Sequence, residues 1–143
     1  PVGKRDFNAR VRANLQSTMQ RLHDMDPDFT SRDFREVLAD VQMGDLVYCD
    51  PPYLLGLAPY NEKNGWSVKD EVDLLEGLSR LSARGIPFVL SNVSENKGLE
   101  HVLLLEWVAQ ESFTLRKLEK SYANSSYQRK ESGPSIEVAV TNF

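Results

Sequence analysis

The stretch Leu46–Tyr60, LVYCDPPYLLGLAPY, decides the fold of this chain. Residues 45–49 are mostly apolar and follow Gly44, which predicts a short buried strand. Proline cannot donate the next ladder hydrogen bond, and it disfavours helical geometry in the residue before it. The strand therefore ends by presenting Asp50, two prolines and Tyr53 beyond its carboxyl end, either as a rigid turn or as a binding site.

The residues that follow predict a second, parallel strand. Residues 54–66 mix apolar residues with Gly and Pro and predict an ordered loop. Ser67 and Asp70 form a capping-box pattern, and a helix is expected to run from there to Gly85, with Glu71 complementing the helix dipole. The expected buried face of this helix comprises Val72, Leu75, Leu78 and Leu81. Residues 86–90 form the next strand, which is expected to stop at Ser91-Asn92. Strand, helix and strand in this order predict a parallel pair with a right-handed crossover.

The rest of the chain predicts further helices before and after this unit. Residues 7–23 carry an apolar stripe at helical spacing, and Thr30 or Ser31 can cap a short second helix through Leu38. Residues 99–109 predict another helix. Residues 112–118 and 136–140 alternate as strands do and can form a hairpin, with residues 122–133 as the connection. The predicted class is α/β.

Composition narrows the class of protein. The chain has 143 residues, a net charge of −4 and one cysteine, Cys49, which we expect to be a reduced, buried thiol. Residues 1–23 and 112–130 each hold five basic residues against one acid, which fits a surface that faces a polyanion. No apolar run is long enough to cross a bilayer, so no membrane partner is expected. His23 and His101 lack Cys or His partners at ligand spacing, so no metal is expected.

The end of the first strand can bind a flat ring that carries an NH₂ group. Ligands of open parallel sheets bind outside the carboxyl ends of the strands, where Asp50 and Ser91-Asn92 are expected to face one crevice. The Asp50 carboxylate and the Pro51 carbonyl can each accept one amine hydrogen, while the Tyr53 ring offers a stacking face. An amine held in this way directs its lone pair at an electrophile. The alternative is a rigid turn without function.

These residues resemble a known family, the Dam-type adenine-specific DNA methyltransferases of bacteria and phages, whose catalytic motif is Asp-Pro-Pro-Tyr. The similarity extends over the opening PVGKR, SRDF at 31–34, GDLVYCDPPY at 44–53, the stretch from Trp66 to Asn92, and the tail from Tyr122 to Phe143. The phage branch looks most similar. The resemblance implies a partial Rossmann-like S-adenosylmethionine-dependent methyltransferase fold, with parallel strands ending in a C-terminal β-hairpin.

The resemblance also implies roles for particular residues. Asp50, Pro51, Pro52 and Tyr53 would hold and stack on a flipped-out adenine. Asp33 and Phe34 would contact the adenine of S-adenosylmethionine, and Asp50 would lie beside its methionine part. Residues that could contact DNA are Lys4, Arg5, Tyr60, Trp66, Arg129 and Lys130.

The function implied by the resemblance is methyl transfer from S-adenosylmethionine to the N6 amino group of adenine in double-stranded DNA. The expected target is a GATC-like site, and the expected setting is restriction-modification in the cytoplasm of a bacterium or of a phage host. The family's Phe-x-Gly-x-Gly cofactor loop is absent from the sequence. We therefore interpret residues 1–143 as one domain, the carboxyl-terminal part of such a catalytic domain. Residues 1–23 would be the tail of the recognition region with a linking helix, and 24–143 the catalytic half. This half would need the upstream half as a partner and would be inactive alone.

Two other hypotheses stay open at this stage. Related motifs serve methylation of RNA bases and of protein glutamine, although these usually carry Asn where Asp50 stands. A chain that keeps the fold could also be a non-catalytic DNA-binding or partner module.

Overall fold

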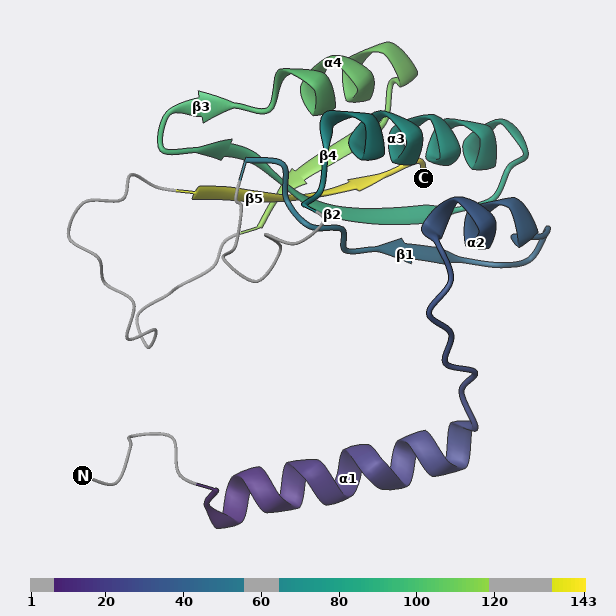
Figure 1. Ribbon diagram of the computed structural model, residues 1–143, viewed down its shortest axis with the longest axis vertical. Coiled ribbons are helices and arrows are strands. Elements are labelled where there is room, and N and C mark those ends of the chain that lie inside the picture. Colours follow the sequence, from purple (N-terminus) through teal and green to yellow (C-terminus); the bar gives the residue numbers. More distant parts are fainter. Residues whose placement is uncertain (1–6, 56–64, 119–134) are drawn as a thin grey trace. The chain divides into compact units, whose positions relative to one another are not determined.

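The structure is a computed structural model that describes residues 7–55, 65–118 and 135–143 (Figure 1). The chain divides into two compact units, Pro1–Arg32 and Asp33–Phe143. No helix in the described part of the chain is long and apolar enough to cross a membrane.

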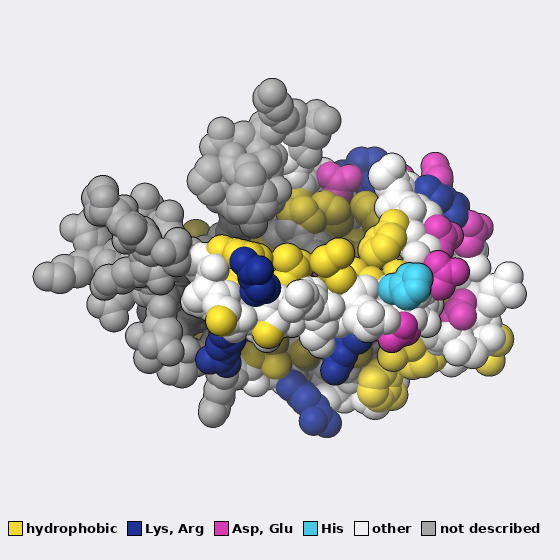
Figure 2. All heavy atoms as spheres, turned by 90° about the horizontal axis from the view of Figure 1, so that it is seen from below, with side chains coloured by type: hydrophobic (Ala, Val, Ile, Leu, Met, Phe, Trp, Pro, Cys, Tyr) yellow, Lys and Arg dark blue, Asp and Glu magenta, His cyan; other side chains and the backbone are white. Residues whose placement is uncertain are grey.

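The first unit is built on one helix, α1 (Ala9–Met25). The Asn8 side chain caps it by accepting a hydrogen bond from the Val11 amide at 3.0 Å, and Asp26 ends it in the left-handed conformation. None of the α1 residues is buried, and its apolar stripe, which includes Leu15 and Met19, is exposed. Figure 2 shows hydrophobic and basic side chains side by side along this helix. The predicted amphipathic helix is confirmed, two residues later than expected.

The second unit contains a five-stranded mixed sheet in the order β1-β2-β5-β4, with β3 paired to β2. Strand β1 (Val47–Cys49) pairs in parallel with β2 (Phe88–Asn96). Strand β5 (Ser135–Thr141) is antiparallel to both β2 and β4 (Thr114–Lys117). The predicted parallel pair and the predicted antiparallel pairing of the last two strands are confirmed. The Rossmann-like assignment itself remains a prediction.

The helices of this unit, α2 (Phe34–Asp40), α3 (Val68–Ala83) and α4 (Val102–Glu111), lie on one face of the sheet (Figure 1). The core lies between them and the sheet, around fully buried Leu78, Phe88 and Leu90. Helix α2 packs closely on α3 because Gly77 has no side chain. A Cβ atom at position 77 would lie 2.7 Å from Leu38 Cδ1.

Three details of the sequence prediction are wrong. Helix α2 is capped by Asp33 and not by Thr30 or Ser31, because the Asp33 carboxylate accepts from the Arg35 amide at 2.9 Å. Strand β2 does not stop at Ser91-Asn92 but continues to Asn96, because β5 pairs alongside it. Leu99–Glu100 is not helical but forms strand β3, which turns back on the end of β2.

The amino end of helix α3 matches its prediction, but the residues on its buried face differ in part from those predicted. The capping box of Ser67 and Asp70 is present in both directions. Val72 is only half-buried, whereas Leu74 and Gly77 belong to the buried face. Glu71, expected to complement the helix dipole, has an exposed fraction of 0%.

Candidate active site

Asp50 lies immediately after the last residue of β1, next to strand β2. Cys49 and Leu90 form the last pair of the parallel ladder, so Asp50 and Ser91 are the next residues on the two neighbouring strands. Ser91 Oγ donates to Asp50 Oδ1 at 2.6 Å, and the Tyr53 hydroxyl donates to the same oxygen at 3.2 Å. The Tyr53 and Ser91 hydroxyl oxygens are 3.5 Å apart. These three residues form what we call the Asp50 cluster.

The Asp50 cluster leaves one carboxylate oxygen open. Asp50 is exposed, and among the described residues both of its donors bind Oδ1. Oδ2 can therefore accept a hydrogen bond from a ligand. Burial raises the pKa of Tyr53, and the nearby Asp50 carboxylate raises that pKa as well. Tyr53 is thus a neutral donor near pH 7, and its hydroxyl holds the carboxylate at Oδ1 while its ring is half-buried.

The strand behind the cluster is anchored in the core. Cys49 precedes Asp50 and packs against the core residues. Burial raises the pKa of the Cys49 thiol to about 11, so that the thiol is protonated at neutral pH. Cys49 was expected as a buried, reduced thiol; it is a free thiol but only partly buried, and its environment is that of a packing residue rather than a nucleophile.

Asp33, Phe34 and Trp66 meet at the amino ends of α2 and α3. The rings of Phe34 and Trp66 are 5.4 Å apart between centroids, and the guanidinium of Arg35 lies 4.4 Å from the Phe34 centroid. The Asp33 carboxylate caps α2 and also accepts from Arg35 Nη1 at 3.2 and 3.3 Å. Trp66 was predicted to contact DNA, and Phe34 was predicted to contact the cofactor. In the structure their side chains pack on each other.

Arg35 joins the amino ends of α2 and α3 electrostatically. Its guanidinium binds Asp70 at 2.6 Å and Asp73 at 2.7 Å, in addition to Asp33. The pKa of Asp70 is lowered by hydrogen bonds from Ser67 and from Arg35. The pKa of Asp73 is lowered by hydrogen bonds from Lys69 and from Arg35, and these carboxylates in turn raise the pKa of Arg35. Arg35 therefore holds the start of α2 against α3.

A buried polar network, which the sequence prediction missed, lies behind these residues. Glu71 accepts from Trp66 Nε1 at 2.5 Å, from Asn92 Nδ2 at 2.9 Å and from His101 Nε2 at 3.2 Å. We call Glu71, Trp66, Asn92 and His101 the Glu71 network. A signal was available in the sequence, because Glu71 shares a helix face with Leu74, Leu75 and Leu78 at spacings of three, four and seven.

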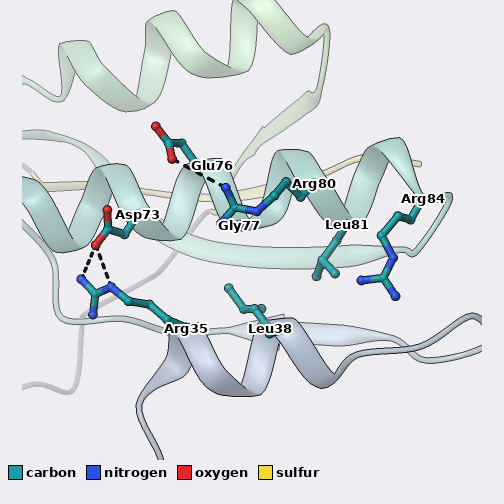
Figure 3. Close-up of a pocket in the computed structure, with 9 residues that line it drawn as sticks. Arg35, Leu38, Asp73, Glu76, Gly77, Arg80, Leu81 and Arg84 are labelled. Carbon is teal, nitrogen blue, oxygen red and sulfur yellow. Dashed lines mark hydrogen bonds and ion pairs between the residues drawn. The ribbon is translucent and has the colours of Figure 1, made fainter.

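A hollow in this unit lies away from the Asp50 cluster. A cavity of about 510 Å³ lies between α2 and α3, lined by residues that include Arg35, Leu38 and Gly77 (Figure 3). Its arginines are engaged: Arg35 with Asp73, Arg80 with Glu76 at 3.6 Å, and Arg84 with the Val41 carbonyl oxygen. None of the Asp50 cluster lines this cavity.

The remaining predicted residues are distributed as follows. Pro51 and Pro52 are half-buried next to Asp50. Within the described ranges, no group of three or more His, Cys, Asp or Glu residues could hold a metal ion. Five predicted DNA contacts lie outside the described residues: Lys4, Arg5, Tyr60, Arg129 and Lys130. The whole 122–133 connection lies outside them too.

Comparison with known proteins identifies the family. Residues 1–125 match the model of the D12 class N6 adenine-specific DNA methyltransferases. This chain belongs to that family.

Curated relatives agree. The chain is 36% identical to the type II methyltransferase M.FokI of Planomicrobium okeanokoites over its whole length, and 36% identical to the modification methylase StsI of Streptococcus sanguinis over 96% of it. It is 39% identical to the retron Ec67 DNA adenine methylase of Escherichia coli over 45% of its length. The alignments span only 23%, 22% and 22% of these relatives.

Proposed function

We propose that this chain carries the adenine-holding side of a DNA methyltransferase active site. The reaction transfers a methyl group from S-adenosylmethionine to the N6 amino group of a flipped-out adenine in double-stranded DNA, within a GATC-like site. The observation that carries the proposal is the Asp50 cluster at the carboxyl end of β1, in a chain of the D12 class.

The proposed chemistry is the activation of a poor nucleophile by position. The lone pair of the adenine amine is delocalised into the ring. If Asp50 Oδ2 accepts one amine hydrogen and the Pro51 carbonyl accepts the other, the nitrogen is favoured as a pyramidal centre with its lone pair directed at the methyl group. The N–CH₃ bond would form as the S–CH₃ bond breaks, the demethylated donor would leave, and the proton would pass from the alkylated nitrogen to water. Asp50 stabilises the positive charge that develops on nitrogen.

Tyr53 has two proposed tasks. Its hydroxyl fixes Asp50 Oδ1 at 3.2 Å, and its ring provides a face for the adenine. An adenine inside a duplex cannot reach the carboxylate unless it is flipped out, and stacking on an aromatic ring offsets part of the unstacking cost.

Asp33 and Phe34 fit the adenine end of S-adenosylmethionine, which when bound supplies an electrophilic methyl group. A carboxylate offers about four acceptor positions. Arg35 occupies two on Asp33 Oδ1 and one on Oδ2, so that one position on Oδ2 remains for an amino group. Phe34 is half-buried and supported by Trp66, which suits a flat ring.

We further propose that the 143 residues do not methylate DNA alone. The sequence lacks Phe-x-Gly-x-Gly, and the alignments span less than a quarter of M.FokI and of StsI. The remaining cofactor contacts would then come from an upstream part of the same enzyme. The alternative is a non-catalytic DNA-binding or partner module.

The test is a reconstitution. The chain is mixed with a separately prepared upstream part of the enzyme, labelled S-adenosylmethionine and GATC-containing duplex DNA. We expect transfer to adenine in the mixture and none with the chain alone. Asp50→Ala should abolish transfer, and Asp50→Asn should reduce it strongly because the charge that stabilises the developing cation is lost. Glu76→Gln, on the exposed side of α3, serves as control. Transfer that survives Asp50→Ala would overturn the mechanism, and no transfer from two folded parts would favour the non-catalytic module.

A further inference from the structure

The Glu71 network connects the proposed cofactor side of the site to strand β2 and helix α4. Glu71 lies in the first turn of α3 and is completely buried, as is Asn92 on β2, and His101 at the start of α4 is 2% exposed. A buried carboxylate is costly unless its oxygens are hydrogen-bonded. Here three side chains from three different parts of the fold bind it, so that Glu71 fixes their relative positions.

The proton positions in the network follow from the hydrogen bonds. His101 Nδ1 accepts from the Leu104 amide at 3.3 Å, and this bond caps α4. Nδ1 is therefore unprotonated, Nε2 carries the proton, and His101 is a neutral donor to Glu71 Oε1. Asn92 Oδ1 accepts from the Val93 amide at 2.7 Å, which directs its NH₂ group to Glu71. Trp66, Asn92 and His101 thus all donate to Glu71, and the Glu71 carboxylate accepts all three of these hydrogen bonds.

The network reaches the site through two neighbours. Trp66 Nε1 donates to Glu71 Oε2, and the same indole packs on Phe34 at 5.4 Å. Asn92 directly follows Ser91, whose hydroxyl binds Asp50. Strand β2 also binds the segment after the catalytic motif, because Asn96 Nδ2 donates to the Leu55 carbonyl oxygen at 2.6 Å. Leu55 is thus tied to β2, and Trp66 is tied to α3.

We propose that Glu71 is a positioning residue that holds the Trp66 indole against Phe34 and so maintains the wall that receives the adenine of the methyl donor. The role of this wall in binding the methyl donor rests on the proposed function, whereas the positioning of Trp66 by Glu71 does not. Replacement by glutamine keeps the size of the side chain but places an NH₂ group among three donors. The Trp66 bond, made by the partner nearest the surface, is the one we expect to be lost.

The test begins with the ¹⁵N-labelled 143-residue chain in solution. Trp66 and Trp107 give the two indole N–H resonances, which single Trp→Phe variants assign. In the wild type we expect a downfield Trp66 indole proton and nuclear Overhauser contacts between the Phe34 and Trp66 rings. Glu71→Gln should shift this proton upfield and remove the ring contacts while the backbone amides keep their dispersion. Glu76→Gln, the same substitution on the exposed side of α3, should change neither. Ring contacts that persist in Glu71→Gln would overturn the proposal.

A second variant covers the case in which Glu71→Gln does not fold. Trp66→Phe replaces the indole by a smaller ring that cannot donate, and it leaves Asn92 and His101 on Glu71, so that the buried carboxylate keeps two partners. We expect the fold to be retained and the ring at position 66 to lose its fixed contacts with Phe34. Unchanged contacts between the two rings would show that Glu71 does not hold them together.

The kinetic readout separates positioning from general stability. In the reconstituted enzyme we expect Glu71→Gln to raise KM for S-adenosylmethionine about tenfold, the equivalent of one buried hydrogen bond, with a smaller change in kcat and in KM for DNA. An unchanged donor KM would overturn the positioning role. If the wild-type mixture is inactive, the proposed function fails, and the resonances of Trp66 decide the inference by themselves.

Discussion

At the scale of single residues, the orientation of Asp50 depends on a neighbour that follows it by 41 positions in the sequence. Ser91 provides the shorter of the two hydrogen bonds to Asp50 Oδ1, 2.6 Å against 3.2 Å from Tyr53. Without this bond only the longer hydrogen bond from Tyr53 holds the carboxylate, and the direction of Oδ2 is less well fixed. Ser91 therefore belongs to the site as a positioning residue.

We predict that Ser91→Ala lowers kcat of the reconstituted enzyme by about tenfold, because the loss of one hydrogen bond to a charged group costs about 1.5–3 kcal/mol and Tyr53 compensates in part. KM for the methyl donor should change less, since Asp33 and Phe34 are untouched. Ser91→Thr keeps a hydroxyl and suits a strand, so that it should restore most of the rate. A full rate in Ser91→Ala would show that Tyr53 alone suffices.

Asp70 shows how a single carboxylate makes stability depend on pH. Its pKa is lowered in the folded chain by Ser67 and Arg35. In the unfolded chain an aspartate titrates near pH 3.9. The contribution of Asp70 is therefore fully present above pH 4 and is lost as the pH falls through the lowered folded-state pKa.

We predict that Asp70→Asn flattens the loss of stability below pH 4, since a neutral amide has no proton to take up. At pH 7 the variant should be less stable than the wild type, because both the capping box and the Arg35 ion pair are weakened. Urea unfolding at several pH values measures both effects. Glu106→Gln, on the exposed side of α4, should keep the wild-type slope. An identical slope in Asp70→Asn would contradict the pKa assignment.

At the scale of elements, Gly77 sets the distance between α2 and α3. A Cβ atom there would lie 2.7 Å from Leu38 Cδ1, inside contact distance, so that Leu38 must move. Alanine favours helix over glycine by about 1 kcal/mol, while overpacking a core costs about 1–3 kcal/mol. We predict that Gly77→Ala lowers the free energy of unfolding by about 1 kcal/mol.

A double-mutant cycle separates the two contributions to that prediction. In a Leu38→Ala background the contact at 2.7 Å is gone, so that only the helix preference remains and Gly77→Ala should become stabilising. Denaturant unfolding of the four proteins gives the coupling free energy between the two positions. A coupling near zero would mean that the two helices do not press on each other at this point.

The elements also show what the sequence could predict. The β1-α3-β2 unit was predictable because its signals are local: the prolines after β1, the capping box at Ser67 and the apolar spacing of α3. The length of β2 was not, since Asn92 and Ser94 look like the end of a strand. Their polar groups are satisfied by Glu71 and by the Ile136 carbonyl oxygen, which are distant in the sequence.

The contrast between local signals and distant partners also applies to the candidate site. Asp50 and Tyr53 were found because they lie within four residues of one motif. Ser91 was placed in the same crevice by the parallel-sheet rule, and the register of β1 and β2 confirms that it is the neighbour of Asp50. His101 was missed because it becomes meaningful only through Glu71, 30 positions away. Glu71 was missed although its spacing to Leu74, Leu75 and Leu78 places it on the buried face of α3.

At the scale of the whole molecule, the distribution of charge matters more than its sum. The net charge of −4 disfavours binding to DNA, but basic residues are concentrated in 1–23 and 112–130. Helix α1 brings Arg10, Arg12 and Arg21 into solvent, because none of its residues is buried. In a family that acts on DNA, an exposed basic helix is a reasonable site for phosphate contacts.

We predict that the chain binds duplex DNA weakly and without sequence preference, with an affinity that falls as salt rises. Each phosphate contact contributes about 0.9 to the slope of log K against log salt. Replacing Arg10, Arg12 and Arg21 by glutamine should therefore reduce the slope by up to about 2.7 if all three contact phosphates. Fluorescence anisotropy of a labelled duplex, titrated at several salt concentrations, measures this slope. Arg80→Gln is the control, because Arg80 is an exposed arginine on α3 next to Glu76. A triple variant with the wild-type slope would exclude α1 from the DNA-binding surface, and the contacts would then have to come from the other basic residues of the chain.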